Sequence, residues 1–390
     1  MKKPIFLILI LFALLLPLSD ASASEGISVG VEDGWIWQIV LLPPPSGWES
    51  DSGISALAAV RCEEKSLAES AGGAAGRDVH FLKEEALTSD NVLPRLAEWR
   101  ERKIAAVLSF DDGGDAALLA PLLGTAGPVF LSAWGEGIDL RGEKGPAPLM
   151  FALDLFQDFR VAAFTRHAGE TLSPGVPVAI LGDRLDPTLD ANARNLADRL
   201  MAGNFSVSTY WIAGGGIDSF NMIGSEVMSS GAEVFISLAG TMVVRDLWLG
   251  SRRQGHPFSL WYCGMYGNFL RAFEGVLLAD QNFPLTLDRT LVTLGREIRK
   301  KQKVFVRDEP LAGRAAACCS WLFKALGRAG SADPLSLAGA MEKAEGIQLG
   351  SQILFIDPAT HRPKEREVAF LTVQKGNFHP LKILSIRGER

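Results

Sequence analysis

The stretch of sequence that decides the fold is IAAVLSFDDGGDAALLAPLLGTAGPVFLS, residues 104–132. Its apolar run at 104–110 is typical of a buried strand, and the spacing at 115–123 is that of a helix. A second apolar run at 128–132 predicts the next strand. Because the chain must cross over between these two strands, the stretch predicts a parallel pair with a helix packed on the sheet.

The same alternation continues in both directions along the chain. Before this stretch we expect strands at 37–42 and 78–82, and helices at 54–68 and 92–102. After a break we expect a second series of strands and helices, at 177–181, 188–202, 206–212, 219–229, 233–238, 241–252 and 258–263. Later segments predict helices at 313–329 and 335–343 and a strand pair at 367–374 and 379–386. The sequence therefore predicts an α/β protein with two doubly wound, Rossmann-like lobes.

The composition agrees with two cores and excludes several functions. The chain has 390 residues, of which 47% are hydrophobic, and a single core rarely exceeds about 250–300 residues. Its net charge of −6 argues against a nucleic-acid partner. No H-E-x-x-H motif occurs, and the one G-x-S-x-G pattern, GISVG at 26–30, follows the N-terminal apolar run and not a predicted strand, so we expect no catalytic residue and no metal site.

The N-terminus has the pattern of a secretory signal. Lys2 and Lys3 precede an apolar run at 5–16 and the small residues 21–23, so we expect a signal peptide at 1–23. The alternative is a retained membrane anchor, although the run is shorter than the ~20 residues of a spanning helix. In an oxidising compartment, a disulfide from Cys62 to Cys318 or Cys319 and buried free thiols both remain open, and the pairing of Cys263 is undetermined.

Several segments resemble, in order, the type I periplasmic binding proteins of the branched-chain amino-acid kind, which serve ABC transporters. They cover about residues 34–380. The segments are AESAGGAAGRDV at 68–79, the stretch 104–123, GPVFLS at 127–132, the helix and turn at 317–334, and GSQILFID at 350–357 with Thr360, His361 and Arg362.

The resemblance implies a receptor whose two lobes are joined by a three-segment hinge. It implies crossings near 151–156, 277–284 and 346–354, so that lobe one is 24–153 plus 278–348 and lobe two is 154–277 plus 349–390. It further implies a periplasmic monomer that binds an amino acid or related carboxylate, needs no cofactor, and delivers its ligand to an ABC permease. A sensor that signals to a membrane protein and a periplasmic enzyme are the alternatives.

The candidate ligand-binding residues lie in loops that follow the predicted strands, where open α/β sheets bind ligands. Main-chain groups near Gly113, Gly114, Ser132 and Trp134 would hold a carboxylate by the resemblance. Asp111 or Asp112 would meet an ammonium group, with a solvated loop acid as the alternative for each. We expect Trp48, Trp134 and Tyr266 to form apolar or cation–π walls, unless they belong to the cores. Gly240 and Thr241 are the lobe-two candidates, with Thr241 offering a hydroxyl.

Two further features have simple interpretations. The basic stretch at 296–303 is expected to be a solvated helix face, with contact to the permease as the alternative. His361, in the turn that resembles the family's, is expected to be a capping or surface histidine.

Overall fold

The computed structural model describes residues 36–387 except for short gaps at 71–72, 112, 135–140, 143–144, 155, 186, 213–216, 240, 256–257 and 263–270. The expected signal peptide at 1–23 lies outside these residues. Among the helices that are described, none is long and apolar enough to cross a membrane.

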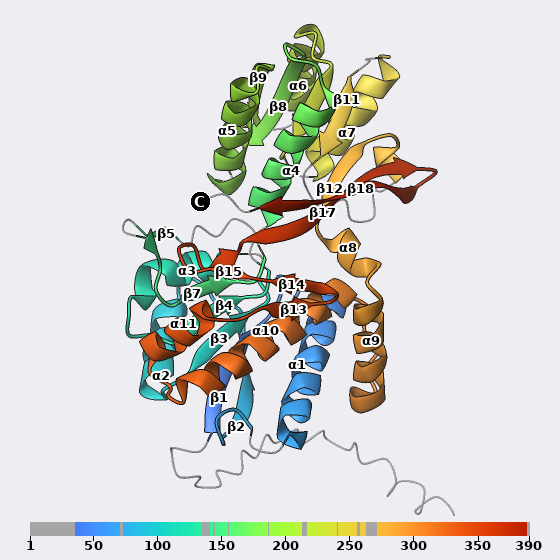
Figure 1. Ribbon diagram of the computed structural model, residues 1–390. Coiled ribbons are helices and arrows are strands. Elements are labelled where there is room, and N and C mark those ends of the chain that lie inside the picture. The colour runs from blue at the N-terminus through green and yellow to red at the C-terminus, as the bar shows by residue number, and fades with distance from the viewer. Residues whose placement is uncertain are drawn as a thin grey trace, which may run out of the picture. The chain divides into compact units, whose positions relative to one another are not determined.

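The first sheet belongs to lobe one and has the strand order β2-β1-β3-β4-β7, with all neighbours parallel (Figure 1). Its strands are β1 (Ile36–Leu42), β2 (Asp78–Lys83), β3 (Ala106–Ser109), β4 (Val129–Ser132) and β7 (Met150–Ala152). The helices between them are α1 (Asp51–Glu69), α2 (Val92–Glu101) and α3 (Gly114–Leu123). The predicted strand–helix–strand unit at 104–132 is confirmed.

The second sheet belongs to lobe two and has the order β18-β17-β12-β11-β10-β8-β9. Its strands are β8 (Pro177–Asp183), β9 (Ser206–Ile212), β10 (Val234–Ser237), β11 (Ser259–Tyr262), β12 (Leu277–Asp280), β17 (Glu365–Gln374) and β18 (Asn377–Arg387). The helices are α4 (Phe156–Thr171), α5 (Pro187–Ala202), α6 (Ile217–Ser229) and α7 (Thr241–Arg253). Strands β17 and β18 are antiparallel, and together they extend the parallel part of the sheet.

The rest of the chain is built mainly onto lobe one. Its helices are α8 (Asn282–Thr286), α9 (Arg289–Gln302), α10 (Glu309–Ala329) and α11 (Pro334–Glu342). Four short strands form two hairpins, β13 (Ile347–Leu349) with β14 (Gln352–Leu354) and β15 (Ile356–Asp357) with β16 (Arg362–Pro363). A further short pair is β5 (Arg141–Gly142) with β6 (Gly145–Pro146).

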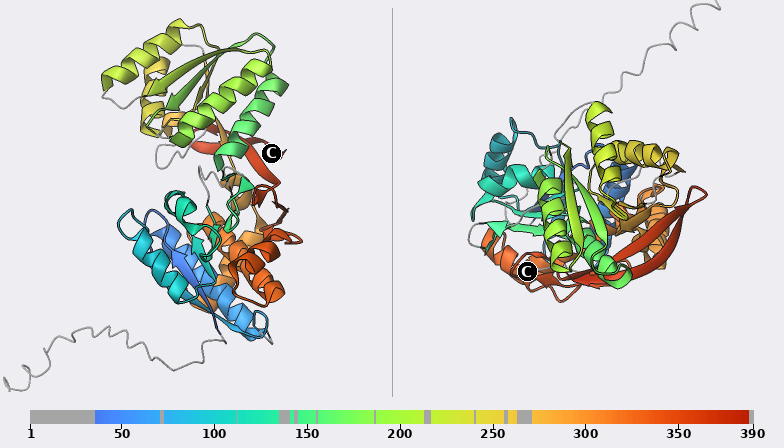
Figure 2. Two further views of the ribbon diagram at one scale, coloured as in Figure 1. Left: turned by 90° about the vertical axis from the view of Figure 1, so that its left-hand side faces the viewer. Right: turned by 90° about the horizontal axis from the view of Figure 1, so that it is seen from above.

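Helices cover both faces of each sheet, as expected for a doubly wound fold (Figure 2). In lobe one, alternate residues of β1 point to opposite faces. Ile39 and Leu41 pack with α1, α10 and α11, whereas Val40 and Leu42 pack with α2 and α3. In lobe two, one face packs against α4 and α5 and the other against α6 and α7.

Local sequence signals set where the helices begin and end. Ser50 caps α1 by accepting a hydrogen bond from the Gly53 N–H at 3.0 Å. Asp308 and Asp333 cap α10 and α11, each followed by a proline in the first turn. Gly330 ends α10 at a φ of 60°, a left-handed conformation that glycine adopts without strain.

His361 is not at the surface, which corrects that expectation. Its side chain is buried, with Nδ1 at 2.9 Å from the Met150 carbonyl oxygen and Nε2 at 3.0 Å from Glu342 Oε1. The ring stacks on Phe151 at 4.2 Å between centroids. The turn at 357–361 is therefore attached to the end of β7 and to α11.

Cys62, Cys318 and Cys319 are free, buried thiols, so the Cys62 disulfide is not formed, whereas Cys263 lies outside the described residues. Burial raises the thiol pKa at all three positions, most strongly at the α10 pair. We expect these three thiols to react with iodoacetamide only after unfolding, because the thiolate is the reactive form. Peptide mass spectrometry of native and denatured samples at about pH 8 measures this, and rapid native labelling of Cys318 would contradict it.

His167 on α4 makes stability depend on pH. Burial lowers its pKa to about 4, and Lys382 adds to the shift. Between about pH 6.5 and 4 the unfolded chain therefore binds a proton that the folded chain does not. The free energy of unfolding consequently decreases as the pH is lowered across this window. Since the ring is partly exposed to water, we expect a loss of only about 1–2 kcal/mol. Urea titrations at several pH values test this, and His167→Gln, which does not titrate there, should flatten the dependence.

Candidate functional site

Each sheet has a point at which the strand order reverses. In lobe one the chain moves from β1 outward to β2 and then returns to β3 on the other side of β1. In lobe two it moves from β8 to β9 and returns to β10. Loops at the carboxyl ends of the flanking strands diverge at such points, and open α/β sheets bind ligands there. The candidate residues after β1, β3, β4 and β10 all follow the carboxyl ends of parallel strands, as predicted.

Trp48 follows β1 and belongs to the lobe-one core. Its side chain is 6% exposed, and its Nε1 donates a hydrogen bond to the Glu84 carbonyl oxygen at 2.7 Å. The ring lies edge-on to Phe110 with 6.1 Å between centroids. The indole thus packs against Phe110, the first residue after β3. Trp48 is therefore a core residue, the alternative to a ligand-binding wall given for it above.

Asp111 follows β3, and its carboxylate is occupied by its own loop. Oδ2 accepts hydrogen bonds from the Gly113 N–H at 3.1 Å and from the Asp115 N–H at 3.0 Å. Asp115 in turn accepts one from the Ser109 hydroxyl at 2.6 Å. These bonds cap the start of α3, so Asp111 shapes the loop in this structure. Its neighbour Asp112 lies outside the described residues.

Gly113 and Gly114 hold the backbone in the shape that this cap requires. Gly113 has a φ of 127°, which side chains rarely tolerate, and a Cβ on Gly114 would lie 3.0 Å from Asp111 Oδ2. The two glycines therefore leave room for the Asp111 carboxylate against the main chain at the start of α3. A helix N-terminus favours an anionic group through its N–H groups and its dipole, and here the Asp111 carboxylate accepts from two of those N–H groups.

Ser132 is the last residue of β4, paired with Ser109 of β3, and Trp134 lies two residues further on. Ser132 is 1% exposed, and its hydroxyl has no hydrogen-bond partner among the described residues, which is uncommon for a buried group. Its carbonyl oxygen accepts a hydrogen bond from the Leu153 N–H at 2.9 Å. Trp134 is half-buried, and the Arg314 guanidinium lies 5.1 Å from the centroid of its ring.

In lobe two the structure describes only part of the candidate site. Thr241 is the first residue of α7, so it stands at the start of the helix after β10, but its side chain is not described. Gly240 and Tyr266 lie outside the described residues. No group of residues suited to a metal ion occurs in the part of the chain that is described.

A buried ionic network, which no pattern in the sequence predicts, joins distant segments beside Trp134. Asp154, just after β7, accepts hydrogen bonds from Arg314 on α10 at 3.1 Å and from Arg366 on β17 at 2.7 Å. All three side chains are fully buried. Arg314 also donates to Asn282 at the start of α8, and Arg366 donates to Gln352 on β14 at 2.6 Å. The network thus connects the three regions in which the chain passes between the two sheets.

The two guanidinium groups decide the charge state of Asp154. Burial alone would raise its pKa, but Arg366 and Arg314 outweigh burial and hold the pKa below its ordinary value. Asp154 is therefore ionised at neutral pH. Removing it would leave two buried cations without their shared counter-ion.

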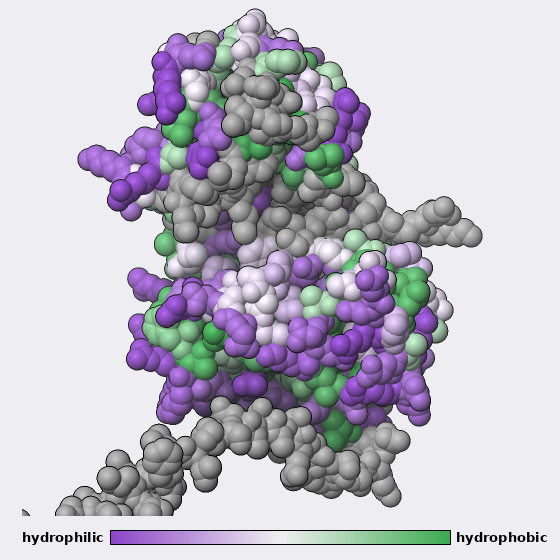
Figure 3. Space-filling model, turned by 180° about the vertical axis from the view of Figure 1, so that it is seen from behind, coloured by the Kyte–Doolittle hydropathy of each residue, from purple (hydrophilic) through white to green (hydrophobic). Residues whose placement is uncertain are grey.

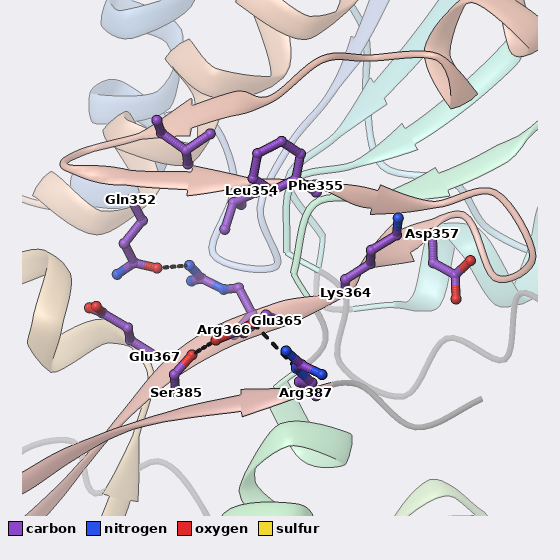
Figure 4. A pocket seen from close by; sticks show the side chains of 11 residues that line it. Gln352, Leu354, Phe355, Asp357, Lys364, Glu365, Arg366, Glu367, Ser385 and Arg387 are labelled. Atoms are coloured by element: carbon purple, nitrogen blue, oxygen red, sulfur yellow. Dashed lines mark hydrogen bonds and ion pairs between the residues drawn. The ribbon is translucent and has the colours of Figure 1, made fainter.

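A cavity of about 630 Å³ lies beside this network, between β14–β15 and β17–β18 (Figure 4). Its lining carries both charges, with the basic residues Lys364, Arg366 and Arg387 and the acidic residues Asp357, Glu365 and Glu367. Arg366 points from β17 toward Gln352, while Glu365 meets Ser385 and Arg387. None of the predicted site residues lines this cavity.

Comparison with known proteins gives a clear result only for structure. No family model matches the chain, and no curated protein sequence matches it. An ABC transporter substrate-binding protein from Desulfitobacterium hafniense superposes with a TM-score of 0.72 at 15% identity, over 89% of this chain and all of the other. A putative branched-chain amino acid ABC transporter protein from Rhodospirillum rubrum gives 0.68 at 16% identity, with coverages of 89% and 100%.

A third similar structure was solved with a ligand. The ABC transporter solute-binding protein from R. palustris, in complex with benzoate, gives a TM-score of 0.65 at 15% identity over 90% of this chain and 97% of the other. Identities this low establish the fold and leave the ligand open. The chain has the two-lobed α/β fold of the type I periplasmic binding proteins, as the sequence resemblance predicts.

Proposed function

We propose that this protein is a solute-binding receptor that captures a small carboxylate-bearing molecule between its lobes and delivers it to an ABC importer. The observation that carries the proposal is the pair of strand-order reversals, one in each sheet, with the candidate loops at the carboxyl ends of the flanking strands. A ligand that is held by loops from both sheets is enclosed when the lobes close about a hinge, and this binding requires no catalytic step. The receptor is accordingly assigned to the periplasm, as a monomer that works with a membrane permease.

The lobe-one edge supplies the groups that would recognise a carboxylate. The start of α3 carries the Gly114 N–H, next to the Gly113 and Asp115 N–H groups that donate to Asp111, and the Ser132 hydroxyl, without a hydrogen-bond partner among the described residues, lies on the neighbouring strand. Trp134 supplies an aromatic wall that is already in contact with a cation. Similar structures carry ligands of this class, since one contains Leu and another contains benzoate.

The predicted division has lobe one at 24–153 plus 278–348 and lobe two at 154–277 plus 349–390, and we propose to move two of these boundaries. The segment 349–363 is assigned to lobe one in this proposal, because Leu349, Leu354 and Ile356 pack in the same core as β1 and α10. Strand β12 is assigned to lobe two because it hydrogen-bonds within the second sheet.

Thermal unfolding in the presence of a ligand panel tests the proposal. A ligand that binds only the folded state stabilises it by about 2.7 kcal/mol at a hundred times its Kd. We expect at least one acid in a panel of amino acids and aliphatic and aromatic carboxylates to raise the unfolding temperature. The matched amides, such as leucinamide for leucine and benzamide for benzoate, should have little effect. A panel without any response, or equal responses to acids and amides, would contradict the proposal.

A further inference from the structure

Helix α9 carries a row of exposed basic side chains on one face. Arg289, Arg296, Arg299, Lys300 and the capping residue Lys303 are all exposed, and none forms an ion pair with a described residue. At about 100° per residue, the four helical members fall within an arc of about 100°, and with Lys303 they extend over about 21 Å. We call these five residues the α9 basic stripe.

The stripe points away from the lobe. Leu291 and Ile298, on the opposite side of the helix, are buried in the lobe-one core. α9 stands beside α1 at the periphery of its lobe (Figure 1). Lys301, outside the arc, instead faces α1, where it donates to the Ser66 hydroxyl at 2.9 Å and pairs with Glu69 at 3.7 Å. The structure thus separates a cation that is paired within the fold from five that form no ion pair with a described residue.

Acidic groups near the stripe do not neutralise it. Glu297 lies outside the arc by about 60° at 100° per residue. Asp288 is buried, and its carboxylate accepts hydrogen bonds from the backbone of Thr290 and Ser351. Asp308 caps α10 and accepts a hydrogen bond from the Ser52 hydroxyl. The chain as a whole has a net charge of −6, so this local excess of positive charge is a marked asymmetry.

Exposed apolar side chains lie at both ends of the stripe. Leu287 precedes the helix and is 58% exposed, while Phe305 follows it and is 64% exposed. The Arg299 guanidinium lies 5.6 Å from the centroid of the Phe305 ring. The surrounding surface of lobe one mixes polar and apolar side chains (Figure 3). Basic residues with flanking aromatic and aliphatic side chains are typical of helices that lie on an anionic membrane surface.

We propose that the α9 basic stripe holds the protein against the anionic headgroups of a phospholipid bilayer. Because the net charge of the whole chain is repelled by such a surface, attraction confined to α9 would select one orientation. Leu287 and Phe305 would enter the interfacial region at the two ends. This inference goes beyond the proposed receptor function, and it would bring a receptor close to the membrane in which its permease lies.

Sedimentation with lipid vesicles tests the proposal on the full mature chain. We expect binding to vesicles that are about half phosphatidylglycerol, and none to pure phosphatidylcholine. Raising the salt from about 0.01 M to about 1 M shortens the screening length from about 30 Å to about 3 Å, so binding should be lost. Absence of binding to the anionic vesicles at low salt would overturn the proposal.

Charge-neutral variants show whether α9 is the surface involved. Each cation near an anionic surface contributes roughly fivefold to the partition coefficient, so Arg296→Gln with Lys300→Gln should weaken binding by about 25-fold. The matched control, Arg253→Gln with Lys324→Gln, removes two exposed cations elsewhere and should bind like wild type. Phe305→Ser should weaken binding several-fold without changing its salt dependence. Equal binding by the α9 variant and the control would overturn the assignment.

Two further measurements distinguish binding to a membrane from binding to free phosphate or to an acidic protein. Inorganic phosphate at matched ionic strength should not displace the protein from vesicles more than chloride does; stronger displacement would instead indicate a site for free phosphate. Binding to polyglutamate but not to vesicles would overturn the membrane assignment in favour of an acidic protein partner. The α9 variant should keep the thermal response to solutes, so failure of this inference is distinct from failure of the receptor proposal.

Discussion

Replacing Asp154 with asparagine is expected to destabilise the folded protein by about 3–5 kcal/mol, the usual cost of removing one member of a buried ion pair. Asparagine has nearly the same shape, but it carries no charge to balance Arg314 and Arg366, which are both fully buried. Urea denaturation followed by circular dichroism measures the change in the free energy of unfolding.

The matched control is Asp51→Asn. Asp51 also pairs with an arginine, Arg307, at 3.1 Å, but both side chains are more than half exposed. An exposed pair of this kind contributes at most about 1 kcal/mol, so the control should be close to wild type. If Asp154→Asn were as stable as Asp51→Asn, the buried network would not be holding the crossing segments together.

Acid should weaken the same network. Because Arg366 and Arg314 keep the pKa of Asp154 below its ordinary value, its contribution to stability is present at neutral pH. That contribution is lost as the pH falls below about 3.9, the value in the unfolded chain, through the lower value in the folded chain. This window lies below the window of His167, so the two effects can be separated in one pH series.

Replacing Trp134 with alanine is expected to weaken solute binding by tenfold or more. Aromatic anchors in a desolvated site typically contribute at least about 1.4 kcal/mol, which corresponds to that factor. Trp134 follows β4, next to the Ser132 hydroxyl, and its ring contacts Arg314. Its loss would therefore remove a wall of the proposed site and one contact of the Asp154 network. Calorimetric titration with the acid found in the thermal panel measures the change in Kd.

Trp211→Ala is the control for this variant. Trp211 is also a partly exposed indole next to an arginine, with Arg194 4.8 Å from its ring centroid. It lies on β9, the edge strand of the second sheet, and its ring contacts Arg184 just after β8, which is not one of the candidate residues. We expect the control to retain its affinity. Equal losses in both variants would indicate general destabilisation, and unchanged affinity in Trp134→Ala would exclude this residue from the site.

The sequence predicted the layered fold well because the signal is local. Each strand is a short apolar run and each helix has its own spacing, so the two series of strands and helices were found with ends within a few residues of those in the structure. Helix α4 was not predicted. Its apolar residues are interrupted by Asp158, Arg160 and Gly169, which weaken the helical pattern. The hairpins β13–β14 and β15–β16 were missed because strands of two or three residues carry no periodicity.

The candidate site was harder to predict because side-chain partners are not visible in a linear pattern. Asp111 was a candidate for the ammonium group of a ligand, with a loop acid as the alternative, and in the structure its carboxylate accepts hydrogen bonds from the N–H groups two and four positions later. The run of aspartates and glycines after a strand was itself the signal for such a cap. The Asp154 network joins residues 160 and 212 positions apart, and no local pattern relates them.

The proposed role as a solute receptor is tested most directly by calorimetric titration with the solute that the protein itself retains. Mass spectrometry of material released by denaturing freshly purified protein identifies that solute, and refolded, emptied protein is then titrated with it. We predict a carboxylate-bearing small molecule that binds once per chain. Protein that releases no solute, and that binds no acid from a broad panel, would contradict the account.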